Sequence, residues 1–474
     1  MGFFCDMNKR HGPIEKRLFR MVDVTFVREQ SPRPVRAMAS MVLLLAACAA
    51  TEEPKRLAAS DMGDGLAPID LGEGVSAKAI AVGEKHTCVI LGDGAVKCWG
   101  DNEFGQLGLG DTKNRGDESD EMGSALPTVD LGFASAVSIS AGAAHTCVVL
   151  DNSSVKCWGM GDARLGISGA GNRGDSPGEM GDTLPAVSFA TGRTGKMVSA
   201  GQSRTCAVLD DGSVQCWGSN VDGELGVGSD STTTMKGIVK LGASASAVAV
   251  GWHHACALLE GGAVKCWGTN KEGELGLEDT KSRGSLADDM GDNLPVVSLG
   301  GTATAIAATW THTCALLDDG RVKCWGNNSS AELGSGDVSN RGAFGGEMGD
   351  ALPAVELGSG RTAKSLTTGL HTTCVVLDNG GVKCWGANSD GTLGVGGSAG
   401  NRGDNRSEMG DALPVVPLGA NRKSEVVASG PGANHRCALL DNGKVKCWGD
   451  NSSGQLGQGD MKARGYVQVV ETPE

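Results

Sequence analysis

The sequence predicts an all-β protein, a seven-bladed β-propeller built from four-stranded antiparallel blades. The dipeptide Trp-Gly recurs seven times, and Leu-Gly follows each copy seven or eight residues later. In the first unit we expect four short strands, because Gly, Asp and Asn separate the segments 66–71, 77–82, 86–91 and 95–99. Seven units of four strands indicate a propeller, with an open solenoid as the alternative. The seven tryptophans are Trp99, Trp158, Trp217, Trp267, Trp325, Trp385 and Trp448.

The composition fits a turn-rich fold and excludes one class of partner. Glycine accounts for 75 of 474 residues, about twice the usual share, which indicates many turns and few long helices. The formal charge of −14 argues against a nucleic-acid partner, because such a partner requires a basic face. The sequence carries no phosphate-binding glycine loop, nucleophile motif or metal-protease helix, so we predict no cofactor and no metal.

The first 47 residues differ in kind from the rest. Two arginines precede an apolar run over 37–47, which is too short to span a bilayer and has the features of an export signal. The run ends in LAAC, which resembles a bacterial lipobox, in which the thiol of Cys48 carries lipid and this cysteine becomes the mature N-terminus. An ordinary secretory signal and a buried helix are the alternatives. Met21 is a better initiator than Met1, because it gives a signal of ordinary length.

These features divide the chain into four regions. We predict a signal region (1–47), a lipidated tether (48–65), the propeller (66–470) and a short tail (471–474). Ala49, directly after the lipidated cysteine, resembles a signal for sorting to the outer membrane. We therefore expect an outer-membrane lipoprotein, and whether it faces the periplasm or the cell surface stays open.

The two ends of the repeat region are complementary. Residues 61–71 match the segment that joins one unit to the next, such as 347–358. The last unit stops after Gly465, where this joining segment would follow. We therefore expect the N-terminal strand 66–71 to complete the seventh blade and close the ring, with 466–470 as the alternative outermost strand.

Fourteen of the 16 cysteines form seven pairs, always ten positions apart. Each pair flanks a short turn, and a three-residue turn that ends in Gly, such as 318–320, is a standard hairpin closure. If Leu317 pairs with Arg321, Cys314 lies opposite Cys324, where side chains approach most closely. We therefore predict seven disulfides, in agreement with export to an oxidising compartment; zinc is the alternative, although Cys-x-x-Cys is absent. The predicted pairs are Cys88 with Cys98, Cys147 with Cys157, Cys206 with Cys216, Cys256 with Cys266, Cys314 with Cys324, Cys374 with Cys384 and Cys437 with Cys447.

Other chemistry-bearing residues recur with the repeat, and we interpret them as structural. A His lies two residues before the first Cys in five units, whereas catalysis needs a general base only once. An Arg and an acid six residues apart recur in five connecting loops and are expected to form salt bridges; calcium binding is the alternative, although the calcium-loop spacing is not met. The histidines are His86, His145, His254, His312 and His435, and the loop pairs are Arg115 with Glu121, Arg173 with Glu179, Arg283 with Asp289, Arg341 with Glu347 and Arg402 with Glu408.

The unit as a whole resembles a known repeat. The fifth copy reads HTCALLDDGRVKCWGNNSSAELG, and this pattern over roughly 66–470 is similar to the repeat of the regulator of chromosome condensation superfamily. The resemblance implies a seven-bladed propeller. The nuclear founder of this superfamily is a guanine-nucleotide exchange factor that docks on chromatin, and secreted bacterial relatives include an inhibitor that caps β-lactamases. This chain departs from the founder by its export signal, its cysteines in every unit and the lack of a basic tail.

Two turn residues before the His column vary between units, while their neighbours hardly change. A rigid scaffold with variable loops is typical of a binding surface. Units four and five alone place Trp there, and Arg204 replaces the His in unit three. Because Trp and Arg dominate binding hot spots, we predict a partner-binding site; the alternative is that both Trp cover the channel mouth or pack between blades. The predicted site residues are Trp252, His253, Trp310, Thr311 and Arg204.

The sequence thus predicts an exported propeller, anchored to the membrane through lipid only, that binds a protein or a cell-envelope component as a monomer. We find no catalytic constellation and do not expect an enzyme. The alternatives are an envelope enzyme with its site at the channel mouth and, from the resemblance alone, a guanine-nucleotide exchange factor.

Overall fold

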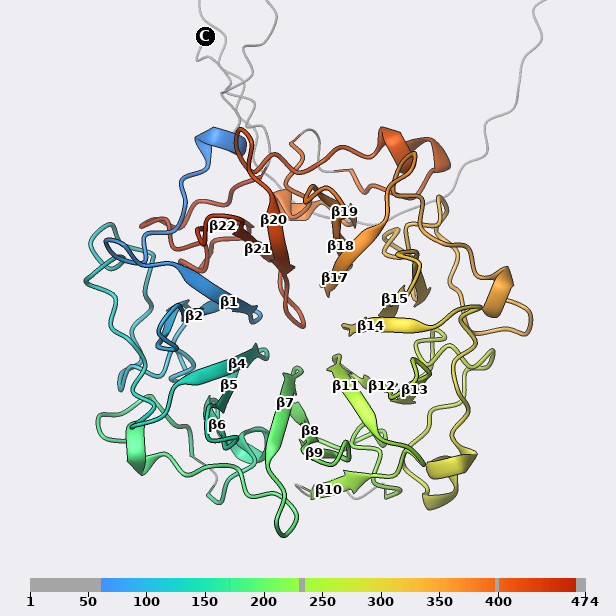
Figure 1. The fold of residues 1–474 in the computed structure, drawn as a ribbon, viewed down its shortest axis with the longest axis horizontal. Coiled ribbons are helices and arrows are strands. Elements are labelled where there is room, and N and C mark those ends of the chain that lie inside the picture. The colour runs from blue at the N-terminus through green and yellow to red at the C-terminus, as the bar shows by residue number, and fades with distance from the viewer. Residues whose placement is uncertain (1–60, 170, 230–234, 397–399, 466–474) are drawn as a thin grey trace, which may run out of the picture. The chain divides into compact units, whose positions relative to one another are not determined.

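Seven small antiparallel sheets follow one another along the chain and surround a common axis in the computed structural model (Figure 1). The structure describes residues 61–169, 171–229, 235–396 and 400–465. The predicted signal region, the lipidated Cys48 and the strand 466–470 lie outside these residues. Within the described ranges, no helix is long and apolar enough to cross a membrane.

Each sheet is one blade, numbered here from one to seven along the chain. The strands are β1 (Ala77–Val82), β2 (His86–Leu91) and β3 (Val96–Gly100) in blade one; β4 (Ala136–Ala141), β5 (His145–Leu150) and β6 (Val155–Gly159) in blade two; β7 (Gly195–Ala200), β8 (Arg204–Leu209), β9 (Val214–Gly218) and β10 (Met235–Val239) in blade three; β11 (Ala245–Val250), β12 (His254–Leu259) and β13 (Val264–Gly268) in blade four; β14 (Ala303–Ala308), β15 (His312–Leu317) and β16 (Val322–Gly326) in blade five; β17 (Ala363–Gly369), β18 (Thr372–Leu377) and β19 (Val382–Gly386) in blade six; and β20 (Ser424–Ala428), β21 (His435–Leu440) and β22 (Val445–Gly449) in blade seven. The connections contain the short 3-10 turns η1 (Gly63–Gly65), η2 (Asp162–Leu165), η3 (Gly181–Thr183), η4 (Ala287–Asp289), η5 (Gly291–Asn293), η6 (Gly349–Ala351), η7 (Ser389–Gly391), η8 (Arg406–Glu408) and η9 (Gly410–Ala412).

The all-β propeller prediction is confirmed, but among the described residues the fourth strand is a full strand only in blade three. In blade two the corresponding segment makes one ladder bond, from Val187 N–H to Val155 O (2.7 Å). Pro185, two residues earlier, has no N–H to donate, whereas the equivalent Gly237 of blade three pairs with Cys216 in the ladder of β10 and β9. Proline therefore reduces the fourth strand to a single bond. The other prolines at this position are Pro127, Pro295, Pro353 and Pro414.

The N-terminal segment supplies the outer edge of blade seven. Ile69 N–H donates to Val445 O of β22 (2.8 Å), which is the bond that the joining segments make in the other blades. Lys446 Nζ donates to Gly63 O (2.6 Å), and Gly63 N–H donates to Pro417 O (2.9 Å). The first and last blades also touch directly, since β1 contacts β20 and β21. Residues 66–71 thus occupy the position that the sequence predicts for closure, as an extended segment.

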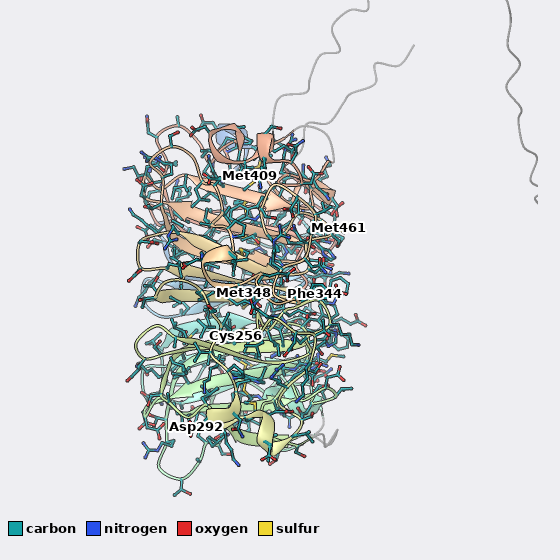
Figure 2. The ribbon with its side chains drawn as sticks, turned by 90° about the vertical axis from the view of Figure 1, so that its right-hand side faces the viewer. Cys256, Asp292, Phe344, Met348, Met409 and Met461 are labelled. Atoms are coloured by element: carbon teal, nitrogen blue, oxygen red, sulfur yellow. A yellow bond between two sulfur atoms is a disulfide. The ribbon has the colours of Figure 1, made fainter. Side chains whose placement is uncertain are left out.

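The core lies between the blades. The middle strand β2 has all six side chains buried, because adjacent blades cover both of its faces. Each Trp of the Trp-Gly column is buried against the preceding blade; the indole N–H of Trp267, for example, donates to Glu224 O (2.9 Å). A Cβ atom at Gly226 would lie 2.7 Å from Trp267 Nε1, so the Leu-Gly glycine provides the room for this ring. Met461, which is 62% exposed, lies at the edge of the molecule (Figure 2).

All seven predicted disulfides are present, and each joins the middle strand of a blade to the strand that follows it. Cys314 lies opposite Cys324 in the ladder of β15 and β16, and their Cα atoms are 4.1 Å apart. Leu317 N–H donates to Arg321 O (2.8 Å), which confirms the expected hairpin register. The other six bridges join Cys88 to Cys98, Cys147 to Cys157, Cys206 to Cys216, Cys256 to Cys266, Cys374 to Cys384 and Cys437 to Cys447.

The prediction for the connecting loops is wrong in most blades. Arg402 and Glu408 form the expected salt bridge (3.0 Å), but Arg115 pairs instead with Asp111, four residues earlier (2.7 Å). Glu121 accepts the backbone N–H of Gly116 (2.9 Å). The acid therefore binds the loop backbone, which offers it a donor without fixing a second long side chain. Three further loops have the same pairing, Arg283 with Asp279, Arg341 with Asp337 and Arg464 with Asp460.

Candidate functional site

The turns between the first and second strands gather beside the central axis, where the first strands converge (Figure 1). Backbone hydrogen bonds join turns of adjacent blades: Glu84 N–H donates to Gly142 O (3.3 Å), and Trp252 N–H donates to Thr309 O (2.9 Å). We call this ring of turns the turn face. Its residues differ between blades, so a partner could distinguish one part of the ring from another.

Aromatic side chains gather on one part of the turn face. Trp252 of blade four stacks on Trp310 of blade five, with ring centroids 4.9 Å apart and an interplanar angle of 24°. His371 of blade six continues the row, with its ring centroid 5.1 Å from that of Trp310. All three side chains are half-buried. We call Trp252, Trp310 and His371 the aromatic row.

The aromatic row also covers part of the channel mouth. The turn of blade seven spans residues 429–434, whereas that of blade one spans only 83–85. This longer turn reaches Trp252, because a Cβ atom at Gly432 would lie 3.1 Å from its ring. The alternative that the two tryptophans serve only in packing therefore holds for one edge of Trp252. The stacked rings of Trp252 and Trp310 remain partly exposed to solvent.

Arg204 lies beneath the aromatic row and holds it from below. Its side chain is 1% exposed, its Nη2 lies 2.8 Å from Glu224 Oε1, and its guanidinium donates to Trp252 O. Burial alone would raise the pKa of Glu224, but His253 and Arg204 hold it below its usual value. Arg204, Trp252 and His253 of the predicted site therefore lie close together, and Arg204 contacts the backbone of Trp252 from within the fold.

Three acids under the turn face escaped the sequence analysis. Glu224, Glu274 and Glu332 are buried and precede the Leu-Gly of blades three, four and five. His253 Nδ1 lies 3.8 Å from Glu224 Oε1, and His371 Nδ1 lies 2.9 Å from Glu332 Oε1. The signal was present in the repeat, since the seven residues at this position read Gln106, Arg164, Glu224, Glu274, Glu332, Thr392 and Gln455.

Glu274 differs from the other two acids. Thr311 stands at the turn position where the neighbouring blades have His253 and His371. Within the described part of the chain, no basic side chain lies at ion-pair distance from Glu274, and burial raises its pKa to about 7. Glu274 is therefore a buried carboxyl group that is part protonated at neutral pH.

The channel itself offers little chemistry. A space of about 270 Å³ is lined by the first strands, including Ala81, Ser140, Val250 and Thr367. None of the described side chains that line it titrates. Over the described ranges, no group of three or more His, Cys, Asp or Glu side chains could hold a metal ion. The turn face, in contrast, carries ionisable side chains that pair with buried acids, among them His253 and His371.

The histidine column forms hydrogen bonds between adjacent blades. His145 Nε2 lies 2.8 Å from Thr205 Oγ1 of the next blade, and the Thr205 hydroxyl donates to Arg164 O (3.0 Å). The hydroxyl oxygen must therefore accept, and His145 carries its hydrogen on Nε2. The same His–Thr pair joins four other blade junctions: His86 with Thr146, His254 with Thr313, His312 with Thr373 and His435 with Thr87.

Comparison with known proteins identifies the repeat. The regulator of chromosome condensation (RCC1) repeat matches residues 77–106, 136–163, 198–224, 245–274, 303–331, 363–392 and 426–455, and a second version of it matches 93–149. The ultraviolet-B receptor UVR8 of Arabidopsis thaliana is 30% identical over 397 residues, which cover 83% of this chain and 81% of the receptor. The chain belongs to the RCC1 repeat family.

Two solved structures share the fold, and a further sequence relative matches most of the chain. Yeast RCC1 (Prp20), in its structure bound to Kap60, is 19% identical with a TM-score of 0.57, covering 88% of this chain and 89% of that one. Human WBSCR16 is 19% identical with a TM-score of 0.55, covering 79% of this chain and 94% of that one. Protein pim1 of Schizosaccharomyces pombe is 25% identical over 417 residues, which cover 83% of this chain and 63% of pim1. The two solved structures thus share the fold of this chain.

Proposed function

We propose that this RCC1 propeller is an exported, membrane-anchored module that binds a protein or cell-envelope component through the aromatic row. The stacked pair of Trp252 and Trp310 carries the proposal. Large aromatic side chains that are half-exposed above a fixed support are typical of binding hot spots. The Arg204–Glu224 pair supplies that support, so the rings lose little conformational freedom when a partner binds.

Two further observations support a binding role. Yeast Prp20 is bound to Kap60 in one crystal structure, and it also binds Gsp1p and histones. The turn residues before the His column differ between blades while their neighbours repeat, which is typical of a binding surface on a rigid scaffold. We infer that the partner of this chain is likewise a protein or a component of the envelope.

The anchor is proposed from the sequence. Seven disulfides suit an oxidising compartment outside the cytoplasm. A tether from Cys48 to Met62, which is buried in the propeller, spans at most about 50 Å even when fully extended, at roughly 3.3–3.6 Å per residue. The propeller would therefore act close to the membrane surface.

Replacing Cys48 by Ala tests the anchor. We expect Cys48→Ala to move the protein from the membrane fraction to the soluble fraction, because the lipid is its only proposed membrane contact. The measurement is cell fractionation followed by immunoblotting. A Cys48→Ala protein that still requires detergent for extraction would contradict the proposed anchor.

Site-specific crosslinking tests the binding face. We expect a photoreactive amino acid at position 311, directly after Trp310 in the turn face, to give one discrete adduct in cells, identified by mass spectrometry. The same group at position 344, where Phe344 is 69% exposed on an outer loop (Figure 2), serves as the control and gives none. The adduct should disappear with Trp252→Ala and Trp310→Ala while the melting temperature changes little. Equal adducts from both positions, or an adduct that survives both substitutions, would place the site elsewhere.

A further inference from the structure

Two of the seven blade junctions replace the His–Thr pair with an arginine. Between blades three and four, Arg204 takes the place of His and Ala255 takes the place of Thr. Between blades six and seven the order is reversed, since Thr372 replaces His and Arg436 replaces Thr. Each substitution brings a positive charge into a position that is neutral in the other blades.

The two arginines differ in how their charge is balanced. Arg204 has its carboxylate in Glu224, 2.8 Å away. Arg436 is fully buried and uses Nη1 to donate to Ala433 O (2.9 Å) and His435 O (2.8 Å). Among the described residues, Nε and Nη2 of Arg436 have no acceptor and no carboxylate pairs with this side chain. Burial lowers the pKa of Arg436 to about 9, so its guanidinium stays charged at neutral pH.

Other hydroxyl groups without a partner lie at the same junction. Thr372 Oγ1 and Ser429 Oγ are buried and, within the described ranges, make no hydrogen bond. A Cβ atom at Gly369 would overlap both Ser429 Oγ and Arg436 Nη2, so these two groups lie close together beside Gly369. Gly369 also pairs with Thr372 in the sheet. The junction therefore brings together N–H and O–H donors around a positive charge.

We propose that the junction of blades six and seven binds one small inorganic anion of halide size, chloride under ordinary conditions. Nε–H and Nη2–H of Arg436 and the hydroxyls of Thr372 and Ser429 would donate to it. A buried guanidinium without a counter-charge is strongly unfavourable, and an anion that accepts all four hydrogens removes that penalty. Ser429 also lines the central channel, which gives the ion a route to the site.

Anomalous diffraction tests the site directly. Crystals of the full-length protein grown in sodium bromide should show a bromide peak within hydrogen-bond distance of Arg436 Nε and Nη2. The substitutions Thr372→His and Arg436→Thr together rebuild the neutral pair of the other junctions, and this double variant should show no peak. Absence of a peak in the wild-type protein would overturn the proposal.

A stability measurement gives a second, independent readout. In detergent-solubilised full-length protein at constant ionic strength, chloride replaces gluconate, and urea unfolding gives the folding equilibrium constant. At chloride concentrations well above the dissociation constant of chloride, the folding equilibrium constant should rise tenfold for each tenfold rise in chloride. In the double variant the folding equilibrium constant should not depend on chloride. Equal chloride dependence in both proteins would overturn the proposal. The aromatic row is intact in both proteins, so neither result depends on the proposed binding function.

Discussion

Buried histidines join the blades one to the next at the scale of single residues. Each donates from Nε2 to a threonine of the following blade, and Nδ1 of His145 has no partner among the described residues. A proton on Nδ1 would be buried without an acceptor, so burial, followed by the nearby charge of Arg164, lowers the pKa of His145 to about 3. The pKa values of the other four histidines are lowered, mainly by burial, to about 4 for His86, 3 for His254, 4 for His312 and 3 for His435.

This column predicts a loss of stability in mild acid. Unfolded histidines bind a proton below about pH 6.5, whereas the folded ones do so only near pH 3 to 4. The free energy of unfolding should therefore be highest above pH 6.5 and fall towards pH 4, by up to about 1.4 kcal/mol per pH unit for each histidine. His145→Gln keeps a neutral N–H donor and should reduce this slope by the share of one histidine. Urea unfolding at several pH values measures it, and an unchanged slope would show that His145 titrates alike in both states.

At the scale of elements, a proline shortens the fourth strand in five of the seven blades. Blade three has Gly237 where five other blades have Pro, and it alone among the described blades forms a full ladder, between β10 and β9. The segments with Pro remain extended because the neighbouring blade and a buried lysine hold them. Lys156 Nζ, for example, donates to Leu131 O (3.1 Å) and Gly181 O (2.7 Å).

Gly237→Pro should convert blade three to the arrangement of the other blades. We expect the amide of Met235 to lose its slow hydrogen exchange while that of Val239 keeps it, because the other blades retain only the bond at the latter position. The free energy of unfolding should fall by about 1 kcal/mol, which is the net contribution of one hydrogen bond. Gly237→Ala is the matched control, since it adds a Cβ atom near Val227 but keeps the N–H. Exchange that is equally fast at both amides would contradict this account.

At the scale of the whole molecule, closure depends on a segment near the start of the described chain. Met62 and Leu66 are buried in the cluster that contains Trp448 of blade seven. The other six joining segments connect consecutive blades, so each is covalently bound to the blade whose edge it forms. The segment at blade seven is covalently bound to blade one, and packing and hydrogen bonds alone hold it to blade seven. Its detachment would open the ring without breaking any covalent bond.

Leu66→Ala should therefore destabilise the propeller more than an equivalent change elsewhere. A cavity at a fully buried leucine costs about 2–5 kcal/mol. Leu184→Ala, at the same position of blade two and also 1% exposed, is the matched control. We expect the lower melting temperature and faster proteolysis for Leu66→Ala, because a freed terminal segment gains more conformational entropy than a segment tethered at both ends. Equal melting temperatures for both variants would show that closure adds nothing to local packing.

The repeat made most of the fold predictable from sequence. Seven copies of one pattern serve as an internal alignment, so strand positions, the disulfides and the role of 66–71 followed from spacing and turn chemistry alone. The predicted strand 77–82 agrees with β1, and 86–91 agrees with β2. Local rules suffice here because each blade is a meander of short hairpins whose register is set by its turns.

Tertiary structure alone decided what lies between the blades. The stacking of Trp252 on Trp310 and the unpaired charge of Arg436 depend on side chains from different units, and the ion pair of Arg204 with Glu224 joins residues 20 positions apart in one unit. Within one loop, too, Arg115 pairs with Asp111 and not with the predicted Glu121, because the loop backbone offers Glu121 its own donors. Sequence periodicity reports what each unit shares, whereas distances between units depend on the angle and spacing at which complete blades pack. The stacking within the aromatic row and the charged junctions therefore became visible only once the ring was assembled.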